Sequence, residues 1–426
     1  MSEDYRKMWS DLEIDLEVHD ALLDAVSSGY NEVYLSQENR PEGMGYFNFV
    51  VSEVHGLRIK ELVDAKREGR RIIGSFCTFV PEELILAVDG ISIGLCAGAE
   101  FAFEEAEKYL PSNTCALIKS AFGFRLGKVC PYLEASDLVV GENTCDGKKK
   151  SYEHMDTLID NLYIMDLPQM KSEEGKSLLK KEYIKFAQKL EDISGKKIGV
   201  SKLKESIQLV NNKRKAVHRI SGLRNADPAP ISGLDALLIN QIFFFDDPIR
   251  FTKSVNQIAD ELGERVIRKI GAKTQGATRI LLSGCPMALP NWKVPHIIET
   301  NGAVIVGEES CVGERGTHWL TKESGDSIED LIDNIVDRYF EINCAVFTQN
   351  SSRLERIREL YKRYNADGII HYNLQFCQPY QIESNLFEGQ LEKEGIPFLR
   401  IDTDYSQEDS GQLTTRVEAF IERLKG

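Results

Sequence analysis

The chain has 426 residues, of which 42% are hydrophobic, and its formal net charge at pH 7 is -15. A chain of this length is too long for one ordinary hydrophobic core, so we expect two or three domains. The acidic charge argues against nucleic acid as the main partner, because a phosphate backbone attracts cationic surfaces.

Residues 1–65 are predicted to form a helical N-terminal arm. Apolar residues recur at helical spacing in a polar segment, at Leu12, Leu16 and Leu22. The first residues are charged and contain no apolar signal-peptide core, and no apolar run in the chain approaches the roughly 20 residues of a membrane span. We therefore expect a cytoplasmic protein without a membrane partner.

Residues 66–150 are predicted to form a first α/β domain, because short apolar strands alternate with helical segments from Arg71 onward. Strands are expected in RIIGSFC and in AVDGISIGLCAG, followed by a helix from about Ala97 to Leu110. A buried strand from Asp137 to Gly141 would bring Cys145 to a strand's carboxyl end.

Residues 151–270 are predicted to be a helical insertion and connecting segment. The sequence is highly charged and has helical periodicity, for example at Leu203, Ile207 and Val210. The prolines of DPAPISG stop one helix, and a further helical segment follows from Ser232 to Ile270.

Residues 271–426 are predicted to form a second α/β domain. Strands are expected in TRILLSGC and GAVIVGEES, and a helix is expected to begin near Ser327. The tail, EGIPFLRIDTDYSQEDSGQLTTRVEAFIERLKG, is typical of a strand, a loop and a helix.

The two α/β domains contain an internal repeat. RIIGSFC matches RILLSGC, with an arginine six residues before the cysteine in both. Four cysteine pairs occur at matching positions and in the same order: Cys77 with Cys285, Cys96 with Cys311, Cys115 with Cys344, and Cys145 with Cys377. Cys130 has no match. The alternative is that any two α/β units look alike and that cysteine is common in cores.

Two doubly wound domains that face each other would bring these loop cysteines to a shared cleft, because ligands bind at the carboxyl ends of parallel strands. Nine cysteines in a reducing compartment indicate metal binding or catalysis rather than disulfides. Clustered thiolates select zinc or iron–sulfur. Structural zinc normally uses CxxC pairs, which this sequence lacks. Ligands dispersed over two domains fit a larger cluster better.

The runs GSFCTFVPEELILAVDG, GENTCDGKKK and YNADGIIHYNLQFC resemble the 2-hydroxyacyl-CoA dehydratase and benzoyl-CoA reductase superfamily of iron–sulfur proteins. The resemblance extends from about Arg71 to the C-terminus. It implies two Rossmann-like domains with a helical segment, and a [4Fe-4S] cluster held by three cysteines at the domain interface. Carried over by motif, those positions are Cys115, Cys145 and Cys377.

Three further cysteines depart from the ordinary dehydratase subunit: Cys285, Cys311 and Cys344. Three more thiolates are what a second cubane requires, so the chain more closely resembles the double-cubane proteins of this superfamily. In those, a bridging sulfide joins two [4Fe-4S] units into an [8Fe-9S] cluster. Cys96 remains an alternative to Cys285, and we assign Cys77 and Cys130 to the core.

The resemblance implies ATP-dependent reduction of small substrates, with electrons from a separate dimeric [4Fe-4S] ATPase activator. The chain has no Walker A motif of its own. Glu308 and Glu309, close to Cys311, are candidate proton donors. Lys148 to Lys150 form either a positive rim for the cluster or a solvated helix start.

A homodimer is expected. Two other functions stay open: an (R)-2-hydroxyacyl-CoA dehydratase subunit with one [4Fe-4S] cluster, and a non-catalytic thiol-rich or iron-storage protein. The iron content distinguishes the dehydratase subunit from a double-cubane protein. The absence of ATP-dependent turnover would indicate the non-catalytic protein.

Overall fold

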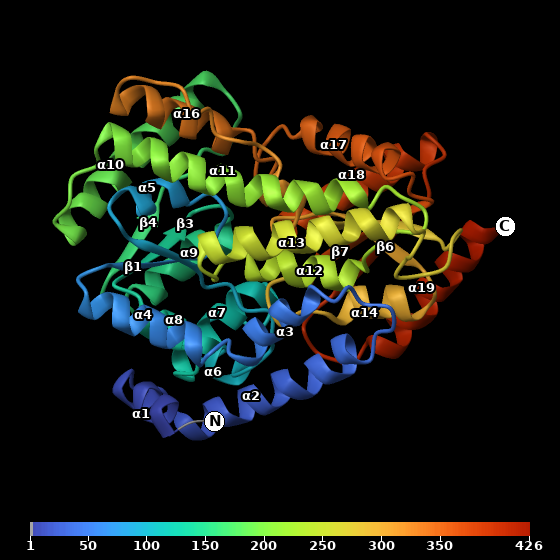
Figure 1. Ribbon diagram of the computed structural model, residues 1–426, viewed down its shortest axis with the longest axis horizontal. Helices are drawn as coiled ribbons and strands as arrows, with labels where there is room; N and C mark the ends of the chain where they lie inside the picture. Colours follow the sequence, from blue (N-terminus) through green and yellow to red (C-terminus); the bar gives the residue numbers. More distant parts are fainter. Residues whose placement is uncertain (1–2) are drawn as a thin grey trace.

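The computed structural model describes residues 3–426 and shows an α/β protein with two parallel four-stranded sheets (Figure 1). The strand order is β2-β1-β3-β4 in the first sheet and β6-β5-β7-β8 in the second. Each strand of the first sheet therefore has a counterpart at the same position in the second. The predicted fold class, two Rossmann-like doubly wound units related by an internal repeat, is confirmed.

The first sheet contains β1 (Ile72–Ser75), β2 (Ile91–Gly94), β3 (Leu138–Glu142) and β4 (Leu162–Met165). The second contains β5 (Arg279–Gly284), β6 (Val304–Glu309), β7 (Gly368–Leu374) and β8 (Phe398–Thr403). The inner strands β3 and β7 are buried at every residue. Their nearly continuous apolar sequences are typical of parallel strands that are covered on both faces.

The N-terminal part is helical, as predicted. It consists of α1 (Glu3–Asp11), α2 (Leu16–Tyr30), the π-helix η1 (Asn31–Leu35), α3 (Met44–Ser52) and α4 (Leu57–Arg67). Asp15 caps α2 by accepting a hydrogen bond from the Val18 N–H at 3.2 Å. Residues 1 and 2 of the predicted arm lie outside the described residues.

The helices of the first unit are α5 (Glu82–Ala87), α6 (Phe103–Ala106), α7 (Ala116–Leu126), α8 (Pro131–Ala135) and α9 (Asp146–Met155). The prediction of one helix from Ala97 to Leu110 is wrong, because only α6 forms there. Ala102 adopts the left-handed conformation with φ 57°, which a right-handed helix cannot continue through. The Gly98 N–H instead donates to the Leu289 carbonyl of the second unit at 2.9 Å.

The segment predicted to be a helical insertion begins with the end of α9 and also contains a strand, β4. β4 pairs in parallel with β3, Val139 opposite Leu162, and forms the edge of the first sheet. The helices follow it: α10 (Glu173–Ser194), α11 (Val200–Leu223), α12 (Gly233–Ile242) and α13 (Pro248–Ile267). The break between α11 and α12 falls at the predicted proline-rich segment.

The second unit adds α14 (Lys293–Thr300), α15 (Glu314–Thr317), α16 (Ile328–Phe340), α17 (Ser351–Arg363), α18 (Gln378–Lys393) and α19 (Ser410–Lys425). Ser327 begins α16 with a capping box to Asp330, which confirms the predicted helix start. Helix α11 lies along α13 and contacts α5 of the first unit and α15 of the second, so it bridges the two (Figure 1). Within residues 3–426, no helix has the length and apolarity that a membrane crossing requires.

Candidate metal centre

A cavity of about 160 Å³ lies between the two units, at the carboxyl ends of their strands. Its lining includes Phe76 and Thr144 from loops of the first unit and Val312 and Tyr380 from the second. Phe244, which follows α12, also lines it. The topology explains this position, since parallel strands of both sheets end at the same place.

Eight of the nine cysteines, all of them within the described residues, line this cavity: Cys77, Cys96, Cys115, Cys145, Cys285, Cys311, Cys344 and Cys377. The six predicted cluster ligands are therefore brought together. Cys130 lies outside the cavity lining, as expected for a core residue. The assignment of Cys77 to the core alone needs correction, because its side chain packs against the core and also lines the cavity.

The repeat explains how the cysteines converge. In the first unit β1, β2 and β3 are followed within three residues by Cys77, Cys96 and Cys145. In the second unit β5, β6 and β7 are followed by Cys285, Cys311 and Cys377. Cys115 is the N-cap of α7, and Cys344 lies in the loop before α17. Matching loops of the two sheets thus present matching thiols.

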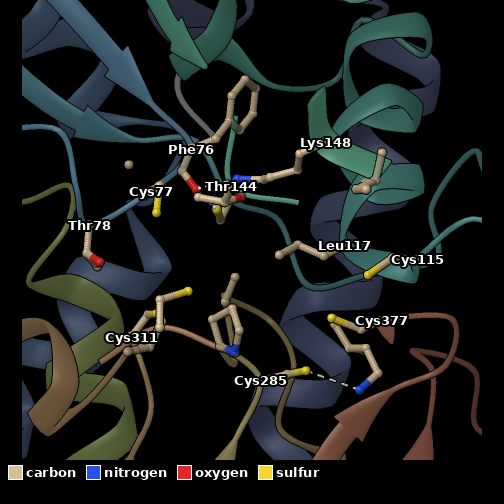
Figure 2. Close-up of a pocket in the computed structure, with 18 of the residues that line it drawn as sticks. Phe76, Cys77, Thr78, Cys115, Leu117, Thr144, Lys148, Cys285, Cys311 and Cys377 are labelled. Carbon is tan, nitrogen blue, oxygen red and sulfur yellow. Dashed lines mark hydrogen bonds between the residues drawn. The ribbon is translucent and has the colours of Figure 1, made fainter. Parts of the chain in front are cut away.

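The thiols form two groups. In the first, which we call the Cys377 group, the thiols of Cys115, Cys285 and Cys145 lie close enough to Cys377 to shift the pKa of its thiol. In the second, the Cys311 group, Cys77 interacts with Cys311 and Cys344. Figure 2 shows Cys115, Cys285 and Cys377 on one side of the cavity and Cys77 and Cys311 on the other.

Burial keeps the thiols of Cys344 and Cys96 protonated in the protein without metal. It raises the pKa of Cys344 to about 11 and that of Cys96 to about 12. The thiol of Cys96 donates a hydrogen bond to the Phe76 carbonyl at 2.9 Å. A metal that binds here must displace protons, because the thiolate is the ligand.

Two cations, the buried Arg315 and the half-buried Lys148, lie beside the Cys311 group. The Arg315 Nη1 atom lies 3.6 Å from Cys311 Sγ. Lys148 lines the cavity and forms an ion pair with Glu142, whose side chain is fully buried. Burial lowers the pKa of Lys148, but the surrounding groups, Glu142 foremost among them, together outweigh it and hold the pKa well above its ordinary value. Of the three predicted lysines, Lys148 faces the cavity and Lys149 and Lys150 are exposed.

Glu308 and Glu309, the candidate proton donors, are buried in ion pairs. Both oxygens of Glu308 accept hydrogen bonds from Arg224 at 2.5 Å. Glu309 pairs with Arg315 at 2.7 Å and with Arg353 at 3.3 Å. Burial would raise the pKa of Glu309, but the two guanidinium groups outweigh it and lower the pKa to about 2. A carboxylate held ionised in this way favours a role in positioning Arg315 over proton donation.

Several residues of the site were missed by sequence reasoning. Arg353 and Tyr380 surround Glu309 and Arg315 through contacts that span up to 65 positions, so no local pattern reveals them. Cys77 could have been recognised, because the repeat pairs it with Cys285, which is among the ligands selected from the sequence.

The donor set fits an iron–sulfur group. Soft thiol sulfur is what iron–sulfur clusters require, and each of the two groups offers at least three thiols. Among residues 3–426, no three His, Cys, Asp or Glu side chains lie as close together as the ligands of a single metal ion.

Comparison with known proteins identifies the family. The family model of the 2-hydroxyglutaryl-CoA dehydratase D-component matches residues 77–424. The chain belongs to this family. It is 36% identical over 379 residues to YjiM of Escherichia coli (strain K12), which carries the provisional name of a dehydratase subunit; the match covers 88% of this chain and 96% of YjiM.

More distant relatives have named activities. The chain is 26% identical to the (R)-phenyllactyl-CoA dehydratase beta subunit of Clostridium sporogenes, over 84% of this chain and 93% of that subunit. It is 21% identical to a benzoyl-CoA reductase subunit of Thauera aromatica, over 81% of this chain and 87% of that protein. The resemblance to the dehydratase and reductase superfamily is thereby confirmed, and an enzymatic function is supported.

Proposed function

We propose that this protein is the catalytic component of an iron–sulfur reductase that carries two [4Fe-4S] units joined as an [8Fe-9S] double cubane. The observation that supports this most strongly is the lining of one cavity by eight cysteines from both units. A single cubane uses at most four thiolates, so the cavity offers enough donors for two. In this proposal Cys115, Cys145 and Cys377 hold one cubane.

The second cubane would be held by Cys311, Cys344 and a third thiolate. The sequence favoured Cys285 for this position, with Cys96 as the alternative. The electrostatic surroundings support Cys77 instead, because both Cys311 and Cys344 raise the pKa of its thiol, whereas of these two only Cys311 acts on Cys96. Cys285 instead raises the pKa of the Cys377 thiol, and its Sγ accepts the Leu374 N–H at 3.3 Å. We therefore propose Cys77 as the third ligand and Cys285 as a neighbour of the first cubane.

When bound, such a cluster supplies single low-potential electrons and an iron position for a small substrate. The chain's own residues would set the conditions around it. Leu117, Leu289 and Val346 give the cavity apolar walls that exclude water. Arg315 directs an N–H toward Cys311 Sγ, which stabilises negative charge on that sulfur. Lys148 adds a second positive charge at the cavity wall.

The proposal includes a partner that supplies electrons, a dimeric [4Fe-4S] activator that hydrolyses ATP. Two features support it: relatives are named as subunits or components of larger systems, and the chain lacks a Walker A motif. We further propose a homodimer located in the cytoplasm, where thiol ligands stay reduced.

A second candidate function is that of an (R)-2-hydroxyacyl-CoA dehydratase subunit with one [4Fe-4S] cluster. The name of the Clostridium sporogenes relative, an (R)-phenyllactyl-CoA dehydratase beta subunit, favours it. Glu308 and Glu309 keep no catalytic role in either proposal, and Glu309 is proposed to position Arg315.

The test is to purify the protein without oxygen, count its iron, and supply ATP, a low-potential reductant and an activator of this family. The reductase proposal expects about eight irons per chain and ATP-dependent reduction of a small substrate by this chain without a different second subunit. About four irons, with dehydration of a 2-hydroxyacyl-CoA only after a second subunit is added, would support the dehydratase instead. Bound iron without any ATP-dependent turnover would indicate storage.

A further inference from the structure

A small polar chamber lies beside Cys77, next to the thiol cavity. Its volume is about 40 Å³, and Cys77 and Thr78 line both spaces. The other walls include Lys213 and Arg214 of α11 and Arg338 of α16. We call it the cationic chamber. Its volume is enough for one or two water-sized groups.

The three cations of the chamber are buried. The residue exposure is 3% for each of Lys213, Arg214 and Arg338. Lys213 pairs with Glu82 at 2.9 Å, and Arg214 pairs with Glu83 at 2.8 Å. Two carboxylates thus face three positive charges.

Arg338 is the cation without a carboxylate. Among residues 3–426 it forms no ion pair. Its Nε donates to the Trp319 carbonyl at 3.1 Å, its Nη2 donates to the Gly316 carbonyl, and it stacks over the Tyr339 ring at 4.3 Å. Neutral carbonyls satisfy N–H groups but leave the charge uncompensated. Burial, together with the neighbouring Arg214, lowers the pKa of Arg338 to about 10.

Three polar atoms around the chamber have no hydrogen-bond partner within the described residues. They are Arg338 Nη1, Arg214 Nε and Thr78 Oγ1, and all three are shielded from solvent. Buried donors are normally paired, and an unpaired charged donor is especially costly. The groups that act most strongly on Arg338 are Arg214, Tyr339, Glu83 and Tyr183, and none of them is a thiol of the neighbouring cavity.

We propose that the cationic chamber binds a small monovalent anion, of the size of a halide or nitrite ion, with Arg338 Nη1 and Arg214 Nε as its hydrogen-bond donors. One negative charge would balance the excess of cations over carboxylates. The volume of the chamber excludes a nucleotide or an acyl-CoA group. This site does not depend on the iron–sulfur proposal, because its proposed donors, Arg214 and Arg338, do not line the thiol cavity. The two spaces share a wall made of Ser75, Cys77, Thr78, Gly94 and Phe244.

The test measures thermal unfolding of the full chain while sodium bromide replaces sodium gluconate at constant ionic strength. A ligand that binds only the folded state raises the unfolding temperature in a saturable way. We expect this rise in the unmodified protein and in the control Arg219→Met, an exposed arginine of the same helix as Arg214. In Arg338→Met we expect bromide affinity to fall by about tenfold or more, since a hydrogen bond to a charged group is lost.

The variant Arg338→Met also shows whether Arg338 binds an anion or only supports the fold. Removing this uncompensated charge is offset by the loss of its hydrogen bonds to the Trp319 and Gly316 carbonyls, so the readout is the bromide response and not the stability in gluconate alone. A stability loss in gluconate with an unchanged bromide response would overturn the proposal, as would the absence of any bromide response in the unmodified protein. If Arg338→Met does not fold, anomalous diffraction from bromide-soaked crystals of the unmodified protein decides. A bromide peak between Arg214 and Arg338 supports the site, and its absence overturns it.

Discussion

The Nη1 atom of Arg315 lies 3.6 Å from Cys311 Sγ, and the Nε atom of the same guanidinium donates to Glu309 at 2.7 Å. The Glu309 carboxylate thus holds a buried positive charge against one proposed cluster ligand. Among the described residues, the Cys377 group has no arginine in a comparable contact. The two cubanes would therefore have different surroundings.

Replacing Arg315 by lysine should lower the reduction potential of the bound cluster. The lysine keeps the charge but loses the planar guanidinium, which reaches the carboxylate and the sulfur together. A hydrogen bond to a charged group contributes about 1.5 kcal/mol, which corresponds to about 60 mV for a one-electron couple. A potentiometric titration followed by EPR measures this shift. Arg358→Lys, in an exposed ion pair with Glu394, is the matched control; equal potentials in both variants would refute the role of Arg315.

Replacing Glu309 by glutamine should destabilise the fold. The pKa of Glu309 is lowered from 4.5 to about 2 by Arg315 and Arg353 against the effect of burial. This contribution to stability is fully present above pH 4.5 and is lost as the pH falls through 2. Its size is about 3 kcal/mol, measured by urea unfolding at pH 7. The control Glu394→Gln, in the exposed ion pair with Arg358, should change the free energy of unfolding little. If the two variants unfolded at the same urea concentration, the buried network would not stabilise the protein.

Glu299 should make stability fall as the pH rises toward neutrality. Burial raises the pKa of Glu299 from 4.5 to about 7, although the N–H groups of Gly233 and Ile305 donate to the carboxylate. The folded state then binds the proton more tightly than the unfolded state, so this contribution is complete below pH 4.5 and is lost as the pH rises through 7. It amounts to about 3 kcal/mol. Glu299→Gln keeps an acceptor for both N–H groups. Measured by urea unfolding between pH 4.5 and 8, the free energy of unfolding of this variant should change less with pH than that of the unmodified protein. An equal change with pH in both proteins would contradict this.

Gly284, immediately before Cys285, should not tolerate a side chain. Its φ is 126°, and an added Cβ would lie 2.0 Å from the Tyr372 carbonyl oxygen. Gly284→Ala should cost about 3 kcal/mol or more in the free energy of unfolding, through backbone strain and the broken contact with β7. Gly276→Ala is the matched control, because its φ is 77° but no heavy atom lies within 4 Å of the added Cβ. Equal losses in the two variants would show that strain alone, and not the close approach to Tyr372, matters.

Much of this architecture could be predicted because it depends on local patterns and on repetition. The apolar strands, the capping box at Ser327 and the paired cysteines are all visible in short segments. The repeat also predicts that loop cysteines meet, since equivalent strands end at one cleft.

What the sequence did not reveal depends on contacts between distant residues. The edge strand β4 forms because β3 offers it a partner, which propensity alone does not indicate. The segment around Gly98 is held by the Leu289 carbonyl of the other unit rather than by its own helical hydrogen bonds. The positions of Arg315 and Lys148 at the thiol cavity, and of Arg338 in the cationic chamber, likewise depend on tertiary packing.

The central claim is that two groups of thiols hold two clusters, and iron counting on cysteine variants tests it most directly. Cys344→Ala and Cys115→Ala should each reduce the iron content of the oxygen-free protein from about eight to about four per chain, and Cys130→Ala, outside the cavity lining, should leave it unchanged. Iron of about four per chain in the unmodified protein, lost in Cys115→Ala but retained in full by Cys344→Ala, would contradict the claim.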